Sequence, residues 1–467
     1  MHYDTYFNSL RGKKILVMGL GVSNRPLVRM LLRYGCDVTG CDKTPRENFD
    51  PELCELEALG CKMKVGQGYL EDLQADLVFR TPGMHPDIPA LCSLRQSGAE
   101  VTSEMEVFFE LCNCHLIAVT GSDGKTTTTT LISEMLKASG KTVWLGGNIG
   151  TPLLPLIDKI RPDDYAVVEL SSFQLMDMHQ SPHIAVVTNL APNHLDVHKD
   201  MQEYIDAKVN LFRYQRPEDV LIVNADNAIT SAFQGNGTMK YFSYSGKVKT
   251  GTYLENDMLC RNGKPLFHKK DIVIPGEHNV ENYLTAIMAV EGLVEDEIIH
   301  RVAKTFGGVE HRIEFVREKD GVRFYNDSIA SSPTRTIAGL KSFPQKVLLI
   351  AGGYDKKIPY DVLGPHICEH VKTLYLGGAT GPQIRKATEN APNYQEGCPR
   401  IVECADFTDA VKKAAADAVS GDVVLMSPAS AAFDQFKNFE YRGRYYKALV
   451  KELEIWNYPV WRKFPES

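Results

Sequence analysis

The sequence lacks the features of a membrane-spanning, secreted or nucleic-acid-binding protein. None of its apolar runs approaches the roughly 20 residues of a membrane span. Residues 1–7 have neither the basic start nor the apolar core of a signal peptide. A net charge of −7 without a long basic run argues against nucleic-acid binding as the main task. We therefore expect a cytoplasmic protein that acts on small molecules, and we expect it to be a monomer.

The eleven cysteines form no recognisable framework. None belongs to a Cys-x-x-Cys pair, and Cys112 and Cys114 are too close together for a zinc ribbon. This usage is typical of reduced thiols in a cytosol. The cysteines therefore predict neither disulfides nor a zinc site.

Length and hydrophobic content allow several domains. The chain has 467 residues, of which 43% are hydrophobic, and this length suggests about three domains of ordinary size. Apolar strand-like segments alternate with amphipathic helical segments along the whole chain, which is typical of doubly wound α/β folds. We expect three such α/β blocks.

The second block starts with a glycine loop at residues 119–127. An apolar segment, 116–119, precedes the loop, and a helical apolar pattern follows it. Gly121 and Gly124 would let the backbone approach phosphates at a helix N-terminus, Lys125 would contact the terminal phosphates, and the Thr126 hydroxyl would contact magnesium. Only two residues separate the glycines instead of the usual four. The alternative is a plain strand-to-helix turn beside a threonine run.

Polar side chains follow the next strands of this block. Residues 165–168 predict a buried strand that ends at Glu169, a candidate magnesium ligand or a simple strand-end acid. His194, Asp196 and His198 follow the strand at 184–190. Lys208 lies among apolar neighbours on a helix expected at 201–212, where an ordinary lysine is solvated.

The first and third blocks also place polar groups at strand ends. Residues 14–24 predict a strand with a Gly-x-Gly turn in which Asn24 replaces a third glycine, and Asp42 ends the second strand, where it could bind a ribose hydroxyl. A tight turn without a ligand is the alternative. Strands at 322–326, 346–351, 373–376 and 422–426 predict a second parallel sheet, whose functional edge carries Asp327, Lys356 and Ser427.

The ordered set of motifs resembles the Mur ligases and folylpolyglutamate synthases, a family whose phosphate loop has this short glycine spacing. The segments that carry the resemblance are 120–127, 169–174, 193–196, Lys208, His278-Asn279, His311-Arg312 and 326–328. Residues 434–443 look most like the D-glutamate-adding members of the family. The resemblance covers essentially the whole chain.

The resemblance implies an α/β fold of three domains. Residues 1–108 would form a Rossmann-like domain that binds the UDP substrate. Residues 109–309 would form a central P-loop domain that binds ATP, and residues 310–467 a Rossmann-like domain that binds the incoming amino acid. The implied reaction adds D-glutamate to UDP-N-acetylmuramoyl-L-alanine with ATP, through an acyl phosphate, in cytoplasmic peptidoglycan synthesis.

The resemblance also implies the site residues. Catalysis would involve Lys125, Glu169, His194 and Lys208. ATP would bind Gly121, Ser122, Asp123, Gly124, Lys125, Thr126, Thr127, Asn279, Asn282, Arg312 and Asp327. The UDP substrate would contact Val22, Ser23, Asp42, Lys43, Thr81, Asn148, Ser171, Gln174 and His194. The amino acid would contact Ser331, Lys356, Phe433 and Phe439. Two Mg²⁺ ions would bind Thr126, Glu169, His194 and a carbamylated Lys208.

The sequence departs from the family pattern in three places. Ser122 and Asp123 replace Thr-Asn in the loop, Ile329 replaces a lysine, and Ala432 replaces a serine of some D-glutamate-adding members. A sister ligase with another amino acid or a folate substrate is therefore an alternative. A P-loop small-molecule kinase and a nucleotide-sugar binding module without catalysis are alternatives from other classes.

Overall fold

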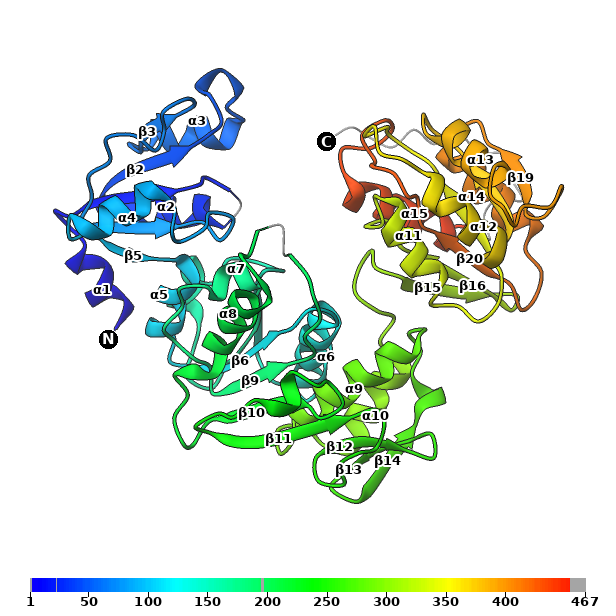
Figure 1. Ribbon diagram of the computed structural model, residues 1–467, viewed down its shortest axis with the longest axis horizontal. Coiled ribbons are helices and arrows are strands. Elements are labelled where there is room, and N and C mark those ends of the chain that lie inside the picture. The colour runs from blue at the N-terminus through cyan, green and yellow to red at the C-terminus, as the bar shows by residue number, and fades with distance from the viewer. Residues whose placement is uncertain (1, 22, 195–196, 454–467) are drawn as a thin grey trace. The chain divides into compact units, whose positions relative to one another are not determined.

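The computed structural model describes residues 2–21, 23–194 and 197–453 and contains three β-sheets in this range (Figure 1). Val22 and Asp196 lie outside the described residues. Each sheet carries helices between its parallel strands, so the predicted α/β class is correct. Among the described residues, no helix is long and apolar enough to cross a membrane.

The first sheet is fully parallel, with the order β3-β2-β1-β4-β5. Its strands are β1 (Lys14–Met18), β2 (Asp37–Asp42), β3 (Lys62–Val65), β4 (Leu77–Arg80) and β5 (Glu100–Thr102). Its helices are α1 (Tyr3–Ser9), α2 (Asn24–Arg33), α3 (Pro51–Ala58), α4 (Pro89–Gln96) and α5 (Glu104–Leu111). This order is a doubly wound arrangement, in which ligands bind at the carboxyl ends of the strands.

The turn after β1 explains why Asn24 replaces a glycine. The Asn24 side chain is buried, and its Nδ2 atom donates to Gly19 O at 2.8 Å. The side chain thus holds the turn closed from inside. A side-chain hydrogen bond therefore stabilises the turn at the position where a third glycine would otherwise let the backbone pack closely.

The second sheet has nine strands in the order β14-β13-β12-β11-β10-β9-β6-β8-β7. The strands are β6 (His115–Thr120), β7 (Val143–Gly147), β8 (Tyr165–Glu169), β9 (Ile184–Val187), β10 (Val220–Asn224), β11 (Thr238–Ser243), β12 (Thr252–Glu255), β13 (Met258–Arg261) and β14 (Lys264–His268). The helices are α6 (Lys125–Ala138), α7 (Ser172–Leu175), α8 (Met201–Arg213), α9 (Glu277–Ala289) and α10 (Asp296–Thr305). Strands β12 to β14 are antiparallel and extend one edge of a parallel sheet.

The third sheet has the order β15-β16-β20-β17-β18-β19, and only the β15–β16 pair is antiparallel. Its strands are β15 (Glu314–Lys319), β16 (Val322–Asn326), β17 (Val347–Ala351), β18 (Val371–Leu376), β19 (Arg400–Glu403) and β20 (Val423–Met426). Its helices are α11 (Pro333–Leu340), α12 (Gly364–His370), α13 (Gly381–Glu389), α14 (Phe407–Asp417) and α15 (Phe439–Lys451). The four predicted strands are present. The two further strands, β15 and β19, are edge strands without the continuous apolar run of a buried strand.

The central strands of the second and third sheets are buried along nearly their whole length, as sheets covered on both faces require. The chain divides into two compact units. One comprises Met1–Lys269 and Val280–Val302, and the other comprises Lys270–Asn279 and Ala303–Ser467. The first two sheets therefore belong to one unit and the third sheet to the other.

Candidate active site

The glycine loop connects β6 to α6, as the sequence predicts. Its two glycines are required because neighbouring side chains leave no room for a Cβ atom. Gly121 has φ 146° and Gly124 has φ 77°, and L-residues with side chains rarely adopt such values. A Cβ atom would lie 1.9 Å from Thr188 Oγ1 at Gly121 and 2.3 Å from Asn282 Oδ1 at Gly124. The short spacing therefore reflects a loop that is packed tightly against β9 and α9.

The first turn of α6 begins directly after Gly124, and no side chain caps it. Its free backbone N–H groups and the helix dipole favour an anion at this position. Lys125 Nζ donates to Ser122 O at 2.8 Å, so the ammonium is held over the loop. Thr126 and Thr127 are half-buried in the same turn. This geometry suits a polyphosphate.

The two loop residues that depart from the family pattern have different environments. Ser122 is buried, and its Oγ lies 2.9 Å from the Tyr204 hydroxyl and donates to Ala191 O at 3.0 Å. Asp123 is exposed, and its backbone N donates to Asn189 Oδ1 at 3.0 Å. Ser122 thus anchors the loop to α8, while the Asp123 carboxylate remains in solvent.

Glu169 ends β8 with an unsatisfied carboxylate oxygen. The residue is 1% exposed. Its Oε1 accepts from Asn148 Nδ2 at 2.8 Å, whereas the buried Oε2 has no hydrogen-bond partner. A buried carboxylate oxygen without a partner is costly, and a hard cation such as Mg²⁺ would satisfy it. The chemistry at Glu169 therefore fits a metal ligand.

Lys208 lies on the buried face of α8 and is not exposed to solvent. It is 1% exposed, and its Nζ donates to Gly121 O at 2.9 Å and Thr120 Oγ1 at 3.1 Å. Burial, together with the charge of Lys125, lowers the pKa of Lys208 well below its ordinary value, although Glu169 acts in the opposite direction. The side chain thus places a buried amine directly beneath the phosphate loop.

The histidines after β9 lie against α7. His194 has φ 56°, and its ring lies 5.1 Å from that of Phe173. His198 is buried, stacks on Phe173 at 5.4 Å, and its Nε2 lies 2.9 Å from Ser172 Oγ. Burial lowers the pKa of His198, although Glu203 acts in the opposite direction. His198 therefore supports Phe173, against which His194 packs.

Other predicted residues lie in the same compact unit. Ser171 and Gln174 satisfy each other in a capping box at the start of α7. Asp42 accepts from Leu20 N at 2.7 Å and from Thr44 N at 2.9 Å. These bonds lower the pKa of its carboxyl group, although burial raises it. Ser23 and Thr81 are half-buried, and Lys43, which follows Asp42 in the chain, is exposed.

The second unit holds a separate set of predicted residues. Arg312 and Asp327 line a cavity of about 300 Å³ together with His278 and Arg335. Asp327 accepts from Ser427 Oγ at 2.7 Å and from Ile313 N at 3.2 Å. Burial raises its pKa to about 7 despite these bonds and the charges of Arg312 and Arg335. Asn279 belongs to this unit, whereas Asn282 belongs to the first.

The predicted amino-acid contacts lie on loops of the second unit. Lys356 is exposed after β17, and Ser331 is half-buried before α11. Phe433 is 59% exposed and forms an edge contact with Tyr354, with ring centroids 5.9 Å apart. Phe439 starts α15, and its carbonyl accepts from Ser328 Oγ at 2.8 Å.

The organising residue of these loops, Arg442, is absent from the predicted site. It is 2% exposed and donates to Ser328 Oγ and O and to the carbonyls of Ser430 and Ala431, at 2.9–3.1 Å. It therefore ties the loop after β16 to the loop after β20. The only signal in the sequence is its place in the 434–443 segment.

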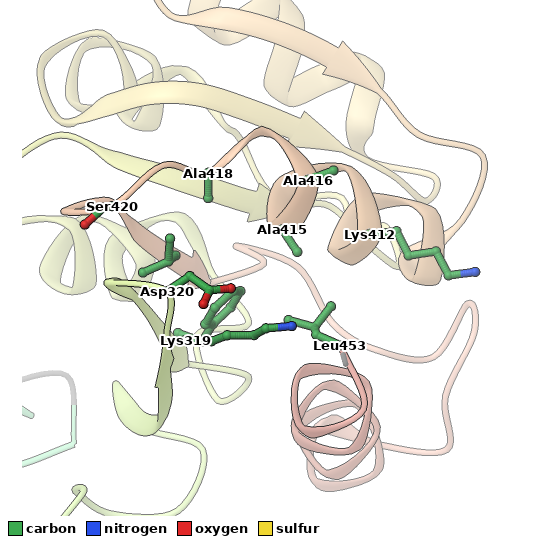
Figure 2. Close-up of a pocket in the computed structure, with 10 residues that line it drawn as sticks. Lys319, Asp320, Lys412, Ala415, Ala416, Ala418, Ser420 and Leu453 are labelled. Carbon is green, nitrogen blue, oxygen red and sulfur yellow. The ribbon is translucent and has the colours of Figure 1, made fainter. Parts of the chain in front are cut away.

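A second cavity of the same unit lies away from these residues. It has a volume of about 610 Å³ and is lined by Lys319, Phe324, Ala415 and Leu453 among others, from the β15–β16 hairpin, α14 and the chain after α15 (Figure 2). None of the predicted site residues that the structure describes lines it. We assign it no part in the active site.

The fold and these groups define an α/β nucleotide-binding protein with a phosphate loop, and sequence comparison identifies its family. Residues 119–290 match the Mur ligase middle domain, and residues 311–430 match the Mur ligase, glutamate ligase domain. The chain belongs to the Mur ligase family. It is therefore an ATP-dependent, amide-forming ligase that uses Mg²⁺.

Several relatives match over nearly their whole length. The UDP-N-acetylmuramoylalanine–D-glutamate ligase of Acetivibrio thermocellus is 54% identical, covering 97% of this chain and 99% of the relative. The enzyme of the same name from Ruminiclostridium cellulolyticum is 48% identical with the same coverage. Among solved structures, the UDP-N-acetylmuramate-alanine ligase of Thermotoga maritima has a TM-score of 0.55 at 19% identity, covering 94% of this chain and 99% of that chain. This structural likeness shows the shared fold.

Proposed function

We propose that this chain joins D-glutamate to the alanyl carboxylate of UDP-N-acetylmuramoyl-L-alanine with ATP, releasing ADP and phosphate, in cytoplasmic peptidoglycan synthesis. The observation that carries this proposal is the 54% identity over 97% of the chain to a relative named for that reaction. We further propose that the protein works as a monomer. Its domains would be residues 1–108 for the UDP substrate, 109–309 for ATP and 310–467 for the amino acid.

The chemistry requires an activated carboxylate. A carboxylate is a poor acylating group, so the alanyl carboxylate attacks the γ-phosphorus of ATP, the bond to ADP breaks, and an acyl phosphate forms. The amine of D-glutamate then attacks the acyl carbon. The resulting tetrahedral intermediate expels phosphate and leaves an amide. A site that holds these anions must supply positive charge where negative charge accumulates.

The phosphate loop and Glu169 supply that environment in the proposal. Lys125 and the N–H groups of the first turn of α6 would bind the terminal phosphates, with Gly121 to Thr127 around them. The Thr126 hydroxyl and Glu169 Oε2 would hold Mg²⁺, which neutralises phosphate charge when bound. Asn279, Asn282, Arg312 and Asp327 would contact the rest of ATP.

Lys208 would hold a second Mg²⁺, together with His194, after carbamylation. Carbon dioxide reacts only with a neutral amine: an N–C bond forms, a proton leaves, and the product is an anionic carbamate. Burial lowers the pKa of Lys208 at the phosphate loop and so favours this form of the amine. Carbamylation would thus convert a buried amine into an oxygen ligand suited to Mg²⁺.

The substrate contacts would be those that the family resemblance implies. The UDP substrate would bind Ser23, Asp42, Lys43, Thr81, Asn148, Ser171, Gln174 and His194, and Val22 beyond the described residues. D-Glutamate would bind Ser331, Lys356, Phe433 and Phe439. Ile329 lacks a charge where the family pattern has a lysine. Lys356, Lys357 or Arg335, which shares a cavity with Ile329, would have to contact the amino acid instead.

The test is ADP release with ATP, Mg²⁺ and UDP-N-acetylmuramoyl-L-alanine, with and without D-glutamate. We expect release to require both substrates and D-glutamate to outperform L-glutamate, D-alanine and lysine. Lys125→Ala should abolish release, whereas Lys137→Ala should not, because Lys137 lies at the far end of the same helix and pairs with Glu134. Release that is indifferent to D-glutamate would overturn the proposal.

Two variants of the assay separate the remaining alternatives. Amine-independent ADP release would indicate a kinase, and a preference for another amino acid would indicate a sister ligase, which Ile329 and Ala432 leave open. For carbamylation, removal of bicarbonate should lower ADP release, and its return should restore it. A Lys208→Ala variant should be inactive with and without bicarbonate. Bicarbonate-independent wild-type activity would contradict carbamylation alone.

A further inference from the structure

A cluster of two histidines and a glutamate lies at the end of α12, outside all the residues discussed so far. His366, Glu369 and His370 each place one possible ligand atom within 4.8 Å of the other two. The His366 and His370 rings are four residues apart on the helix and nearly parallel, with centroids 6.2 Å apart and an interplanar angle of 21°. Residues at this spacing share one helix face.

The donor atoms of the cluster are available for a ligand. His366 Nδ1 is buried and has no hydrogen-bond partner. His370 Nε2 lies 3.6 Å from Glu369 Oε2, which is beyond hydrogen-bond distance. His370 and Glu369 keep exposed side chain surface, 22% and 64% respectively. An ion from solvent can therefore reach both side chains.

The local electrostatics favour a bound cation. The cluster occupies the last turn of α12, where helix carbonyl groups carry partial negative charge. The Lys341 ammonium opposes a bound cation, and the Glu369 carboxylate offsets it.

We propose that His366, Glu369 and His370 form a binding site for a divalent transition metal ion of the zinc type. Two imidazoles and one carboxylate are a donor set that Zn²⁺ accepts, with water in a fourth position. Mg²⁺ and Ca²⁺ prefer oxygen ligands alone. The cysteine pattern gives no signal for such a site, because none of its ligands is a cysteine.

This site would be separate from the ligase chemistry. α12 runs back from β17 to the start of β18, so its last turn lies at the amino ends of the parallel strands. Asp327 and Lys356 follow the carboxyl ends of β16 and β17, at the opposite edge of the sheet. The His-x-x-Glu-His spacing also occurs in metalloproteases in which the glutamate is a base. Here Glu369 would be a ligand, so we propose binding without hydrolysis.

A comparable cluster in the other unit does not support the same proposal. His85, Asp87 and Glu203 also lie close together. The Lys199 ammonium, however, lies 3.1 Å from Asp87 and 3.2 Å from Glu203. A cation of the protein itself thus already neutralises those carboxylates. The described residues offer no such lysine contact to Glu369 among their ion pairs.

The test is equilibrium dialysis of the full chain against Zn²⁺ in excess Mg²⁺. We expect the wild type to bind one more zinc ion per chain than the double variant His366→Gln/His370→Gln. His370→Gln or Glu369→Gln alone should weaken zinc binding by about ten-fold or more. His300→Gln is the matched control, because His300 instead stacks on Phe267, with ring centroids 5.0 Å apart.

Two further readouts decide the result. Zn²⁺ should raise the thermal unfolding temperature of the wild type more than that of the double variant. ADP release in zinc-free buffer should be equal in both proteins, which shows that the variant is folded. Equal zinc stoichiometry in wild type and double variant would overturn the proposal, because zinc would then bind elsewhere.

Discussion

The substitution Gly121→Ala should disrupt the phosphate loop, for reasons of space and backbone conformation together. The added Cβ would lie 1.9 Å from Thr188 Oγ1. Thr188 is buried, and its hydroxyl donates to Asp123 O at 2.6 Å and approaches Thr120 O at 3.3 Å. The threonine therefore cannot rotate away without losing a buried hydrogen bond.

The expected loss of stability has two parts, backbone strain at residue 121 and a lost buried hydrogen bond. A non-glycine residue held at φ 146° is strained by about 1–3 kcal/mol. The loss of a buried hydrogen bond adds about 1–3 kcal/mol. We therefore expect Gly121→Ala to lower the free energy of unfolding by about 2–6 kcal/mol, or to displace the loop and weaken nucleotide binding by a comparable free energy.

Thermal unfolding and ADP titration calorimetry would measure these effects. Gly140→Ala is the matched control, because Gly140 has φ 82° but a Cβ there meets nothing within 4 Å. A Thr188→Ala background removes the clashing hydroxyl, so Gly121→Ala should cost less in that background. If Gly121→Ala is as mild as Gly140→Ala and leaves ADP affinity unchanged, the packing argument is wrong.

Three further predictions concern buried charged groups, each measured by chemical denaturation at several pH values. Burial lowers the pKa of Lys208. The free energy of unfolding of the bicarbonate-free wild type should therefore rise by about 1.4 kcal/mol per pH unit as the pH increases from that lowered pKa to about 10.4. Lys208→Met should lose this contribution and should also lose ADP release. The pKa of Asp327 is raised to about 7, so the folded state keeps a proton that the unfolded state loses. Asp327 should therefore contribute a fall in stability of about 1.4 kcal/mol per unit from about pH 4 to pH 7, and Asp327→Asn should lose this contribution while those of Glu104 and Glu106, whose pKa values burial also raises to about 7, remain. Arg442→Met removes the donor of four buried hydrogen bonds and should cost about 3 kcal/mol or more. Arg442→Lys should recover only part of that loss, because an ammonium lacks the guanidinium fork; full recovery would show that charge alone matters.

Local sequence signals predicted the strand–loop–helix unit well, because its requirements are local. Gly121 and Gly124 mark backbone conformations that other residues avoid, and a buried apolar run places Glu169 at a strand end. What they could not show is why the loop is short. Thr188 and Asn282, which fill the space beside the glycines, come from distant parts of the chain.

Long-range packing also explains the residues that local patterns describe poorly. Lys208 looks like an ordinary helix lysine, but it shares a buried face of α8 with Tyr204 and Leu211. Arg442 looks like a surface arginine, but four acceptors from two other loops converge on it. In both cases the partners are defined only after the sheets bring separate segments together. The sequence does not predict the edge strands β15 and β19 for a related reason. Their faces are only partly covered, so they lack a continuous apolar run.

The segment Lys270–Asn279 has a practical consequence for dissecting this ligase. It belongs to the second compact unit although residues on both sides of it belong to the first. A recombinant fragment that begins at Ala303 would therefore leave ten residues of its own unit behind, among them His278, which lines the cavity with Arg312 and Asp327. Nucleotide-analogue or inhibitor screening against such a truncated piece would probe an incomplete pocket wall.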